Sequence, residues 1–147
     1  MIVFISILAA FLFMEFMAWF AHKYIMHGLL WNLHEDHHQP TGHFFQKNDL
    51  FFLIFAIPSW LTIMLGFIYD NSISIGIGFG IAAYGLAYFL MHDILIHRRK
   101  KWFDNTNNRY FRAARKAHKA HHKNRFKEDG KCFGMLLFPM KFYKEAK

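Results

Sequence analysis

Ten of the eleven histidines in this 147-residue chain fall into four short clusters, and imidazole is the commonest side-chain ligand for transition metals. The clusters are His22 and His27; His34, His37 and His38; His92 and His97; and His118, His121 and His122. A tetrahedral site has only four ligand positions, so ten histidines are more than one such ion can use. The sequence therefore predicts two metal ions in one histidine-rich shell.

The spacing within each cluster indicates how a helix would present it. In clusters 34–38 and 118–122, histidines spaced three and then one apart lie on one side of a helix. In the other two clusters the histidines are five apart, a rotation of roughly 140° on a straight α-helix. Each such pair either serves two different metals or requires the helix end to open. One cluster alone fits surface histidines as well as ligands, whereas four clusters together favour ligands.

The composition is typical of a membrane protein, because 54% of the residues are hydrophobic, 20% are aromatic, and they occur in long blocks. Residues 1–21, 50–69 and 73–91 each have about the 20 residues that a helix needs to cross the hydrocarbon core. No basic segment precedes the first stretch, which favours a retained span over a cleaved signal. We expect a single all-α domain, 1–147, in which an integral membrane bundle of three helices carries a histidine-rich helical cap, 98–147.

The charges predict the orientation of this bundle. All 18 Lys and Arg residues lie at Lys23, at Lys47 or from Arg98 onward. By the positive-inside rule the histidine-bearing side is cytoplasmic, and the N-terminus and the 70–72 turn lie outside. All ten clustered histidines can then meet at one membrane boundary, under a helix predicted over 110–125. The net charge of +8 has this topological cause, and no nucleic-acid motif accompanies it, so we expect no nucleic-acid partner.

The donor types leave several metals open, because imidazole binds zinc, copper, iron and nickel alike. Cys132 is the only cysteine, which excludes thiolate sites such as zinc fingers and iron–sulfur clusters. A two-metal centre at the mouth of an apolar bundle suits the activation of dioxygen against a substrate that stays in the bilayer. Iron is the usual metal for that chemistry, and the protein orients the substrate. We infer two iron ions from this role.

Several runs of residues resemble one branch of a known superfamily. They are AHKYIMHG at 21–28 within 15–28, the HxxHH motifs at 34–38 and 118–122, NDL at 48–50, and AYGLAYFLMHD at 83–93 followed by His97. In this order and approximate spacing they are similar to the carotenoid ring hydroxylases of the fatty acid hydroxylase/sterol desaturase superfamily. The resemblance covers about residues 10–140. The segment after His122 keeps only part of the family pattern.

The resemblance implies a bacterial inner-membrane di-iron monooxygenase. It would hydroxylate carbon 3 of a β-ionone ring, converting β-carotene through β-cryptoxanthin to zeaxanthin, with some relatives accepting ketolated rings. The electrons would come from reduced ferredoxin or a similar donor fed by NAD(P)H. Either the basic residues from Arg98 onward dock this acidic carrier, or they only set the topology. The oligomeric state stays open.

Two carboxylates are candidates for orienting ligands. Glu15 lies within the first span, where a charge is costly unless it is paired; it either orients His22 or another ligand, or makes a helix–helix hydrogen bond. Asp93, beside His92, is placed to accept a hydrogen bond from an imidazole. We expect His43, outside the clusters, to be an ordinary loop residue.

Other polar residues and the aromatic side chains have simpler readings. Asn48 and Asp49 would cap the second span. Glu35 and Asp36 would either accept hydrogen bonds from imidazole N–H groups or, as we expect, be solvated. The 19 Phe residues either line a substrate channel or face lipid and core.

Two further functions remain as alternatives to carotenoid hydroxylation. One is a fatty acyl or sterol hydroxylase or desaturase of the same superfamily, which shares the histidine motifs. The other is a membrane protein that binds or transports zinc or copper. Transport would require polar residues through the depth of the spans, and apart from Glu15 and a few Ser, Thr and Asn these offer little.

Overall fold

The computed structural model describes residues 1–39 and 42–146, and within them every regular element is a helix. Three helical stretches are long and apolar enough to cross a membrane: Ile2–Leu29, Lys47–Ile68 and Ser72–Ile96. Their segments are α1 (Ile2–Phe20) with η1 (Ala21–Leu29), η2 (Lys47–Leu50) with α3 (Phe51–Ile68), and α4 (Ser72–Phe89) with η3 (Leu90–Ile96). The predicted all-α membrane bundle with three spans is confirmed.

The first and third stretches run past their predicted ends at 21 and 91, because each α-helix widens into a π-helix instead of stopping. These segments, η1 and η3, contain the histidine pairs that are five residues apart. The second stretch begins three residues early, because the 3₁₀ turn η2 precedes α3. The additional turns extend the helices at the end that carries the histidines.

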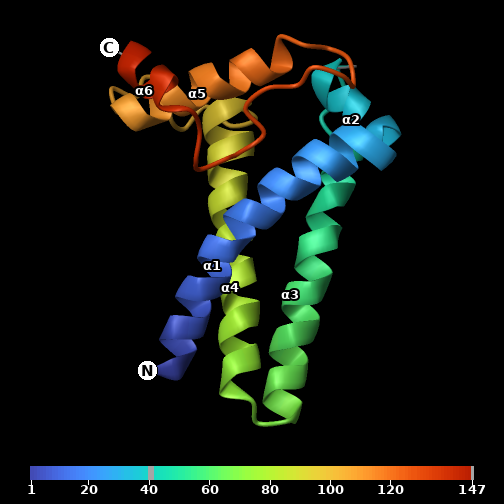
Figure 1. The fold of residues 1–147 in the computed structure, drawn as a ribbon, viewed down its shortest axis with the longest axis vertical. Helices are drawn as coiled ribbons and strands as arrows, with labels where there is room; N and C mark the ends of the chain where they lie inside the picture. Colours follow the sequence, from blue (N-terminus) through green and yellow to red (C-terminus); the bar gives the residue numbers. More distant parts are fainter. Residues whose placement is uncertain (40–41, 147) are drawn as a thin grey trace.

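A tight hairpin joins α3 to α4 at the opposite end of the bundle (Figure 1). Asp70 has a positive φ of 49°, which short polar side chains tolerate better than most. Asn71 then caps α4, since its side-chain oxygen accepts a hydrogen bond of 3.0 Å from the amide of Ser74. The hairpin returns α4 to the end of the bundle from which α3 started.

Helix α4 packs against both α1 and α3, and its glycines allow these close approaches. A Cβ atom at Gly80 would lie 2.5 Å from the carbonyl oxygen of Ile7 in α1. One at Gly78 would lie 2.9 Å from the carbonyl oxygen of Ser59 in α3. Small residues of this kind are typical of helix contacts in membranes. They make α4 the central helix and fix the other two spans around it.

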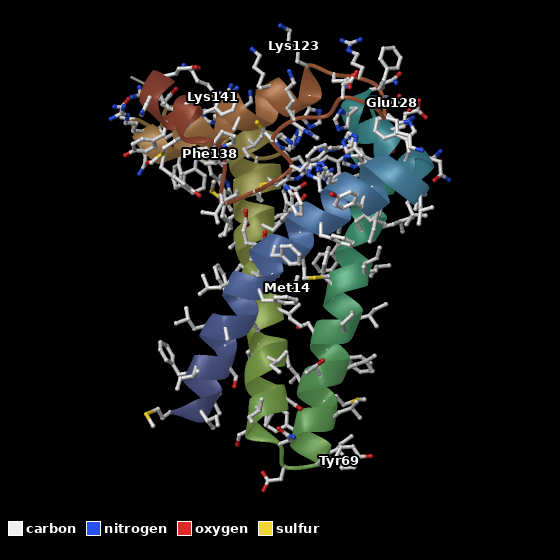
Figure 2. The ribbon with its side chains drawn as sticks, in the orientation of Figure 1. Met14, Tyr69, Lys123, Glu128, Phe138 and Lys141 are labelled. Atoms are coloured by element: carbon white, nitrogen blue, oxygen red, sulfur yellow. The ribbon has the colours of Figure 1, made fainter. Side chains whose placement is uncertain are left out.

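Shorter helices form a cap over one end of the bundle: α2 (Trp31–His38), α5 (Arg109–His122) and α6 (Met140–Glu145). Helix α5 lies across the end of α4 and η3, and the segment after it returns over the same end of the bundle toward α6 (Figure 1). Its observed end at His122 is three residues before the predicted one, and its start is capped by the side chain of Asn108. Lys123, Glu128 and Lys141 lie at this end, and Tyr69 lies at the hairpin end (Figure 2).

The outer surface of the spans is strongly apolar. Large side chains such as Phe4, Phe52, Trp60 and Phe67 are each more than 60% exposed. Continuous apolar exposure of this extent is expected where a helix faces lipid and not water. The three apolar helices therefore indicate an integral membrane protein whose polar cap covers one end of the bundle.

Candidate metal centre

The π-helical segments bring each pair of histidines onto one face of its helix. The i→i+5 hydrogen bonds of a π-helix widen the turn, so residues five apart lie almost in line. In η1 the ring centroids of His22 and His27 are 5.4 Å apart. In η3 those of His92 and His97 are 4.5 Å apart, and the amide of His97 donates to the carbonyl of His92 at 2.8 Å. The sequence left two alternatives for each pair, binding two different metals or an opened helix end, and the structure has the opened helix.

The clusters spaced three and then one apart, on α2 and α5, divide in opposite ways. On α2, His34 and His38 face one group of histidines and the intervening His37 faces another. On α5, only the middle residue, His121, joins the first group. His118 and His122 join the second. Each cap helix therefore contributes to both groups.

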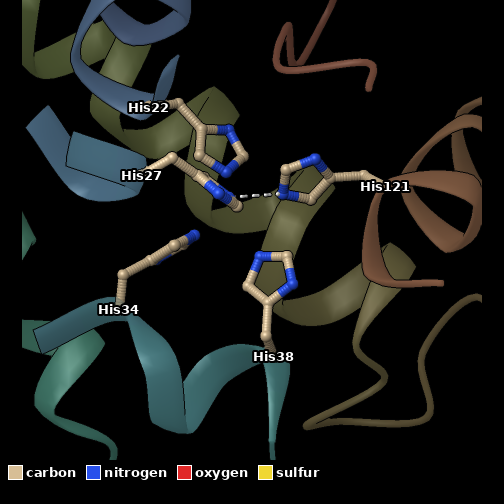
Figure 3. A group of neighbouring side chains, drawn as sticks. All are labelled: His22, His27, His34, His38 and His121. Carbon is tan, nitrogen blue, oxygen red and sulfur yellow. Dashed lines mark hydrogen bonds between the residues drawn. The ribbon is translucent and has the colours of Figure 1, made fainter. Parts of the chain in front are cut away.

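Nine of the ten clustered histidines form two adjacent groups, each with nitrogen atoms all within 4.8 Å of one another. The first group is His22, His27, His34, His38 and His121, and the second is His37, His97, His118 and His122. The tenth, His92, adjoins the second group, with its Nε2 atom 3.0 Å from Nε2 of His37. In the first group the rings come from η1, α2 and α5 and point toward a common centre (Figure 3). The rings of His38 and His122 stack at 4.4 Å, so the two groups touch.

Backbone carbonyls in the loop after α5 orient most of the first group. The Nδ1 atoms of four of its histidines lie within hydrogen-bonding distance of carbonyl oxygens in residues 124–133. The pairs are His22 with Phe133 (3.0 Å), His27 with Lys127 (3.1 Å), His38 with Asn124 (2.9 Å) and His121 with Lys131 (2.8 Å). A carbonyl only accepts, so each Nδ1 carries the proton and each Nε2 has a free lone pair. This tautomer is the one that a metal requires at Nε2.

Side chains before the second span do the same for α2. The Nδ1 atom of His34 donates to Oδ1 of Asn48 at 2.6 Å, and that of His37 donates to Oε1 of Gln46 at 2.9 Å. Asp49 has its predicted capping role, since its carboxylate accepts a hydrogen bond from the Gln46 amide at 3.1 Å. The polar residues at 46–49 thus hold two histidines as well as starting a helix.

Asp93 and Arg99 connect η3 with this turn. The carboxylate of Asp93 lies 3.3 Å from Nδ1 of His92 and 3.0 Å from Nε of Arg99. The guanidinium also reaches Oδ1 of Asp49 at 2.7 Å and Oε1 of Gln46 at 3.3 Å. The two partly buried carboxylates share one cation, so neither charge is left unpaired.

The free nitrogen atoms fit a cation. Nε2 of His22, His34 and His38 are buried and make no hydrogen bond to any described residue. In other pairs two Nε2 atoms face each other, as in His27 with His121 at 3.2 Å. Two lone pairs with no proton between them repel at that distance, and a buried polar atom without a partner is costly. Metal ions would remove both costs, so the residues present fit a two-metal centre.

Burial also keeps these imidazoles neutral. Burial, reinforced by the neighbouring histidines, lowers the pKa of His38 to about 4 and that of His121 to about 3. The pKa values of His34, His37 and His118 are likewise lowered, mainly by burial. The neutral form is the one that binds metal, so the groups are prepared as ligands at neutral pH.

Glu15 makes no direct hydrogen bond to a histidine in the described residues. Its carboxylate accepts hydrogen bonds from the amides of Met135, Leu136 and Leu137 at 2.8 to 3.1 Å, and from the hydroxyl of Tyr84 at 2.7 Å. The Tyr84 contact is the helix–helix bond that was one of its predicted alternatives. All of these partners donate, which matches a carboxylate that only accepts. Glu15 therefore anchors the loop that carries Phe133.

The remaining candidates lie outside the two groups. His43 is exposed, and so is Glu35. Asp36 is half-buried and not fully solvated as we expected, because its carboxylate accepts a hydrogen bond from the Lys47 amide at 2.6 Å. Gln46 and Arg99 were not among the site residues predicted from the sequence. The polar residues directly before the second apolar span were the sequence signal that could have pointed to the 46–49 turn. The carbonyl acceptors in the 124–133 loop leave no sequence signal, because every residue has a backbone carbonyl.

Comparisons with known proteins agree with this geometry. The fatty acid hydroxylase family model matches residues 7–140. A beta-carotene hydroxylase of Pantoea ananas is 40% identical over 145 residues, covering 95% of this chain and 77% of the relative. One of Paracoccus sp. is 34% identical over 137 residues, covering 92% and 84%.

Plant relatives are longer. Beta-carotene hydroxylase 1, chloroplastic, of Capsicum annuum is 37% identical over 129 residues, which cover 86% of this chain and 40% of the plant protein. The chain thus spans about 40% of the length of such plant relatives. No solved structure matches it. The predicted resemblance is confirmed: the chain belongs to the fatty acid hydroxylase family.

Proposed function

We propose that this protein is a membrane di-iron monooxygenase that hydroxylates carbon 3 of carotenoid β-ionone rings, from β-carotene through β-cryptoxanthin to zeaxanthin. The observation that carries the proposal is the pair of adjacent histidine groups, whose Nε2 atoms converge while oxygen acceptors hold most of their Nδ1 atoms. The bacterial relatives named as beta-carotene hydroxylases support the choice of substrate.

The ten clustered histidines would hold two iron ions, five residues to each group with His92 in the second. Bound iron would supply the activation of dioxygen at this boundary between cap and bundle. One oxygen atom enters the C–H bond of the ring, and the other leaves as water after two electrons and two protons are delivered. The balance therefore requires an external reductant, for which we propose a reduced ferredoxin or a similar donor fed by NAD(P)H.

The chain's own residues have three tasks in this proposal. The carbonyls of the 124–133 loop and the side chains of Gln46 and Asn48 keep the imidazoles in one tautomer and one orientation. Eight of the ten clustered histidines are buried beneath the cap, His121 completely, and this burial limits the access of bulk water to the centre. The spans would hold an apolar substrate in the bilayer beside the centre, with the spans and the cap acting as one domain.

We further propose that the cap faces the cytoplasm across a bacterial inner membrane. The support is the charge distribution, since 16 of the 18 Lys and Arg residues lie from Arg98 onward and the hairpin end has none. The same basic surface, which includes Lys123 and Lys141 (Figure 2), offers an acidic electron carrier complementary charge.

The experiment that tests the function is pigment analysis of β-carotene-producing bacteria that express the chain. We expect cryptoxanthin and zeaxanthin to accumulate, and a His37→Ala strain to keep β-carotene. Unchanged β-carotene beside folded, iron-loaded wild-type protein would refute the substrate and favour a ketolated carotenoid, a fatty acyl chain or a sterol. Protein that folds with zinc or copper alone would instead support a metal-binding role.

A further inference from the structure

An apolar groove opens beside the histidines on the lipid-facing side of α1. It consists of two adjoining cavities of about 370 and 320 Å³, and Trp19, Gly134 and Leu137 line both. Cavities that bind small molecules start at roughly 300 Å³. Leu12 and Phe16, which line the outer cavity, are 64% and 52% exposed and lie within the first membrane span. The groove is therefore open to hydrocarbon.

The inner end of the groove reaches the first histidine group through one side chain. Phe133 lines the inner cavity, and its ring packs edge-on against the rings of His22, His27 and His121, with centroids 5.2 to 5.4 Å apart. The groove follows α1 from Leu12 to Trp19, roughly 10 Å at 1.5 Å per residue. A single phenyl ring thus separates a lipid-accessible cavity from the candidate metal ligands.

The one carboxylate that lines the groove does not make it polar. Glu15 lines the outer cavity, but its oxygens are occupied by the amides of Met135, Leu136 and Leu137 and by the hydroxyl of Tyr84. A carboxylate with its acceptor positions filled imposes little further desolvation cost on an apolar ligand. The same hydrogen bonds hold the far wall of the groove against α1.

We propose that this groove binds the ring end of a carotenoid while the rest of the polyene stays in the bilayer, and that Phe133 determines which ring carbon reaches the metals. The inference rests on the proposed function and adds the binding site to it. The occupant follows from three features: the opening toward hydrocarbon, the aromatic walls at Trp19, Phe133 and Phe138, and the position of the inner end, which only the Phe133 ring separates from the histidines. Flat aromatic walls suit a ring better than a flexible acyl chain.

Cys132 provides a probe inside the groove, since it lines the inner cavity and is partly exposed. We would measure its alkylation by N-ethylmaleimide in membranes of identical lipid with and without β-carotene, at alkaline pH because burial raises the pKa of the thiol. We expect β-carotene to slow the alkylation at least threefold. The matched control is a Cys132→Ser, Phe126→Cys variant, whose new thiol replaces a side chain that is 69% exposed on the cap and outside the groove. Its rate should not change.

A second measurement tests the groove by placing a bulkier side chain in it. Leu12 and Leu8 both lie on α1 and are at least half exposed, but only Leu12 lines the groove. Leu12→Trp should lower hydroxylated carotenoid about tenfold at unchanged iron content, since steric changes in an apolar pocket are worth roughly ten- to two-hundredfold. Leu8→Trp should stay within about twofold of the wild type.

The two measurements separate the groove from the function. Two results would refute carotenoid binding in the groove and leave the hydroxylase activity standing. One is an alkylation rate of Cys132 that β-carotene does not lower; the other is an equal yield of hydroxylated carotenoid from Leu12→Trp and Leu8→Trp in an active enzyme. Wild-type protein that slows its alkylation with β-carotene but forms no hydroxylated product would support the groove and refute the reaction.

Discussion

The Nδ1 atom of His22 donates a hydrogen bond of 3.0 Å to the carbonyl oxygen of Phe133, 111 residues further along the chain. This contact ties the end of the first span to the loop after α5. The same loop supplies carbonyls to His27, His38 and His121. Because these acceptors are backbone atoms, the loop's conformation rather than its side chains sets four of the proposed ligands.

Removing a proposed ligand should remove metal and activity together. His121→Ala removes one converging nitrogen from the first group, and His37→Ala removes one from the second. In each variant we expect the iron content per protein and the yield of hydroxylated product to fall about tenfold or more. Iron analysis of purified protein and pigment extraction measure the two effects. His43→Ala is the control and should be near normal, because His43 is exposed and outside both groups. A fully active His37→Ala protein would refute the assignment.

Asn48 should matter for metal affinity although it is not a ligand. Asn48→Ala removes the 2.6 Å acceptor of His34 and leaves a buried Nδ1–H unpaired. Loss of such a partner typically weakens metal binding about 10–100-fold, which a competition titration with a chelator measures. Asn108→Ala is the matched control, because Asn108 caps α5. It should cost about 1 kcal/mol of stability and leave the affinity unchanged. Equal affinities in the two variants would contradict this role for Asn48.

The features that depend on residue type and on the helical period could be predicted from the sequence. Long apolar blocks predict the three spans, and the histidine spacings predict ligand faces, because side-chain direction follows helical period. The division of each HxxHH motif between two groups was not predictable, since it depends on how α2 and α5 cross. Nor was the choice of a π-helix at His22 and His92, because a five-residue spacing is equally compatible with two separate metals.

Glu15→Gln should disturb the loop that carries Phe133. The amide NH₂ of the new glutamine would face groups that are themselves hydrogen-bond donors: the amides of Met135, Leu136 and Leu137 and the hydroxyl of Tyr84. An unpaired donor of this kind costs roughly 1–3 kcal/mol of stability. We expect turnover per folded, iron-loaded protein to fall more than the protein level does.

Glu35→Gln is the control for this variant, because Glu35 is exposed and bonds only weakly to Gln39 at 3.4 Å. It should change neither quantity. If Glu15→Gln lost folded protein but kept normal turnover in the remainder, Glu15 would serve packing alone.

Acid should destabilise the metal-free protein in a defined range of pH. In the folded state burial lowers the pKa of His38 from 6.5 to about 4 and that of His121 to about 3. Between these values and 6.5 the unfolded chain binds more protons, so stability falls as the pH falls. The stabilising contribution is fully present above about pH 6.5. We expect the Tm of metal-free protein in detergent to be constant from about pH 8 to 7 and to decrease below about 6.5.

The metal-loaded protein should lose iron in the same range, because protons compete with the metal for Nε2. Iron release and Tm, measured on matched samples across the titration, test the two expectations together. A Tm that stays constant down to about pH 4.5 would contradict the first expectation, since the folded protein would then bind as many protons as the unfolded chain. We expect the opposite, because Nε2 atoms as close as those of His27 and His121, 3.2 Å apart, cannot both be protonated without repulsion.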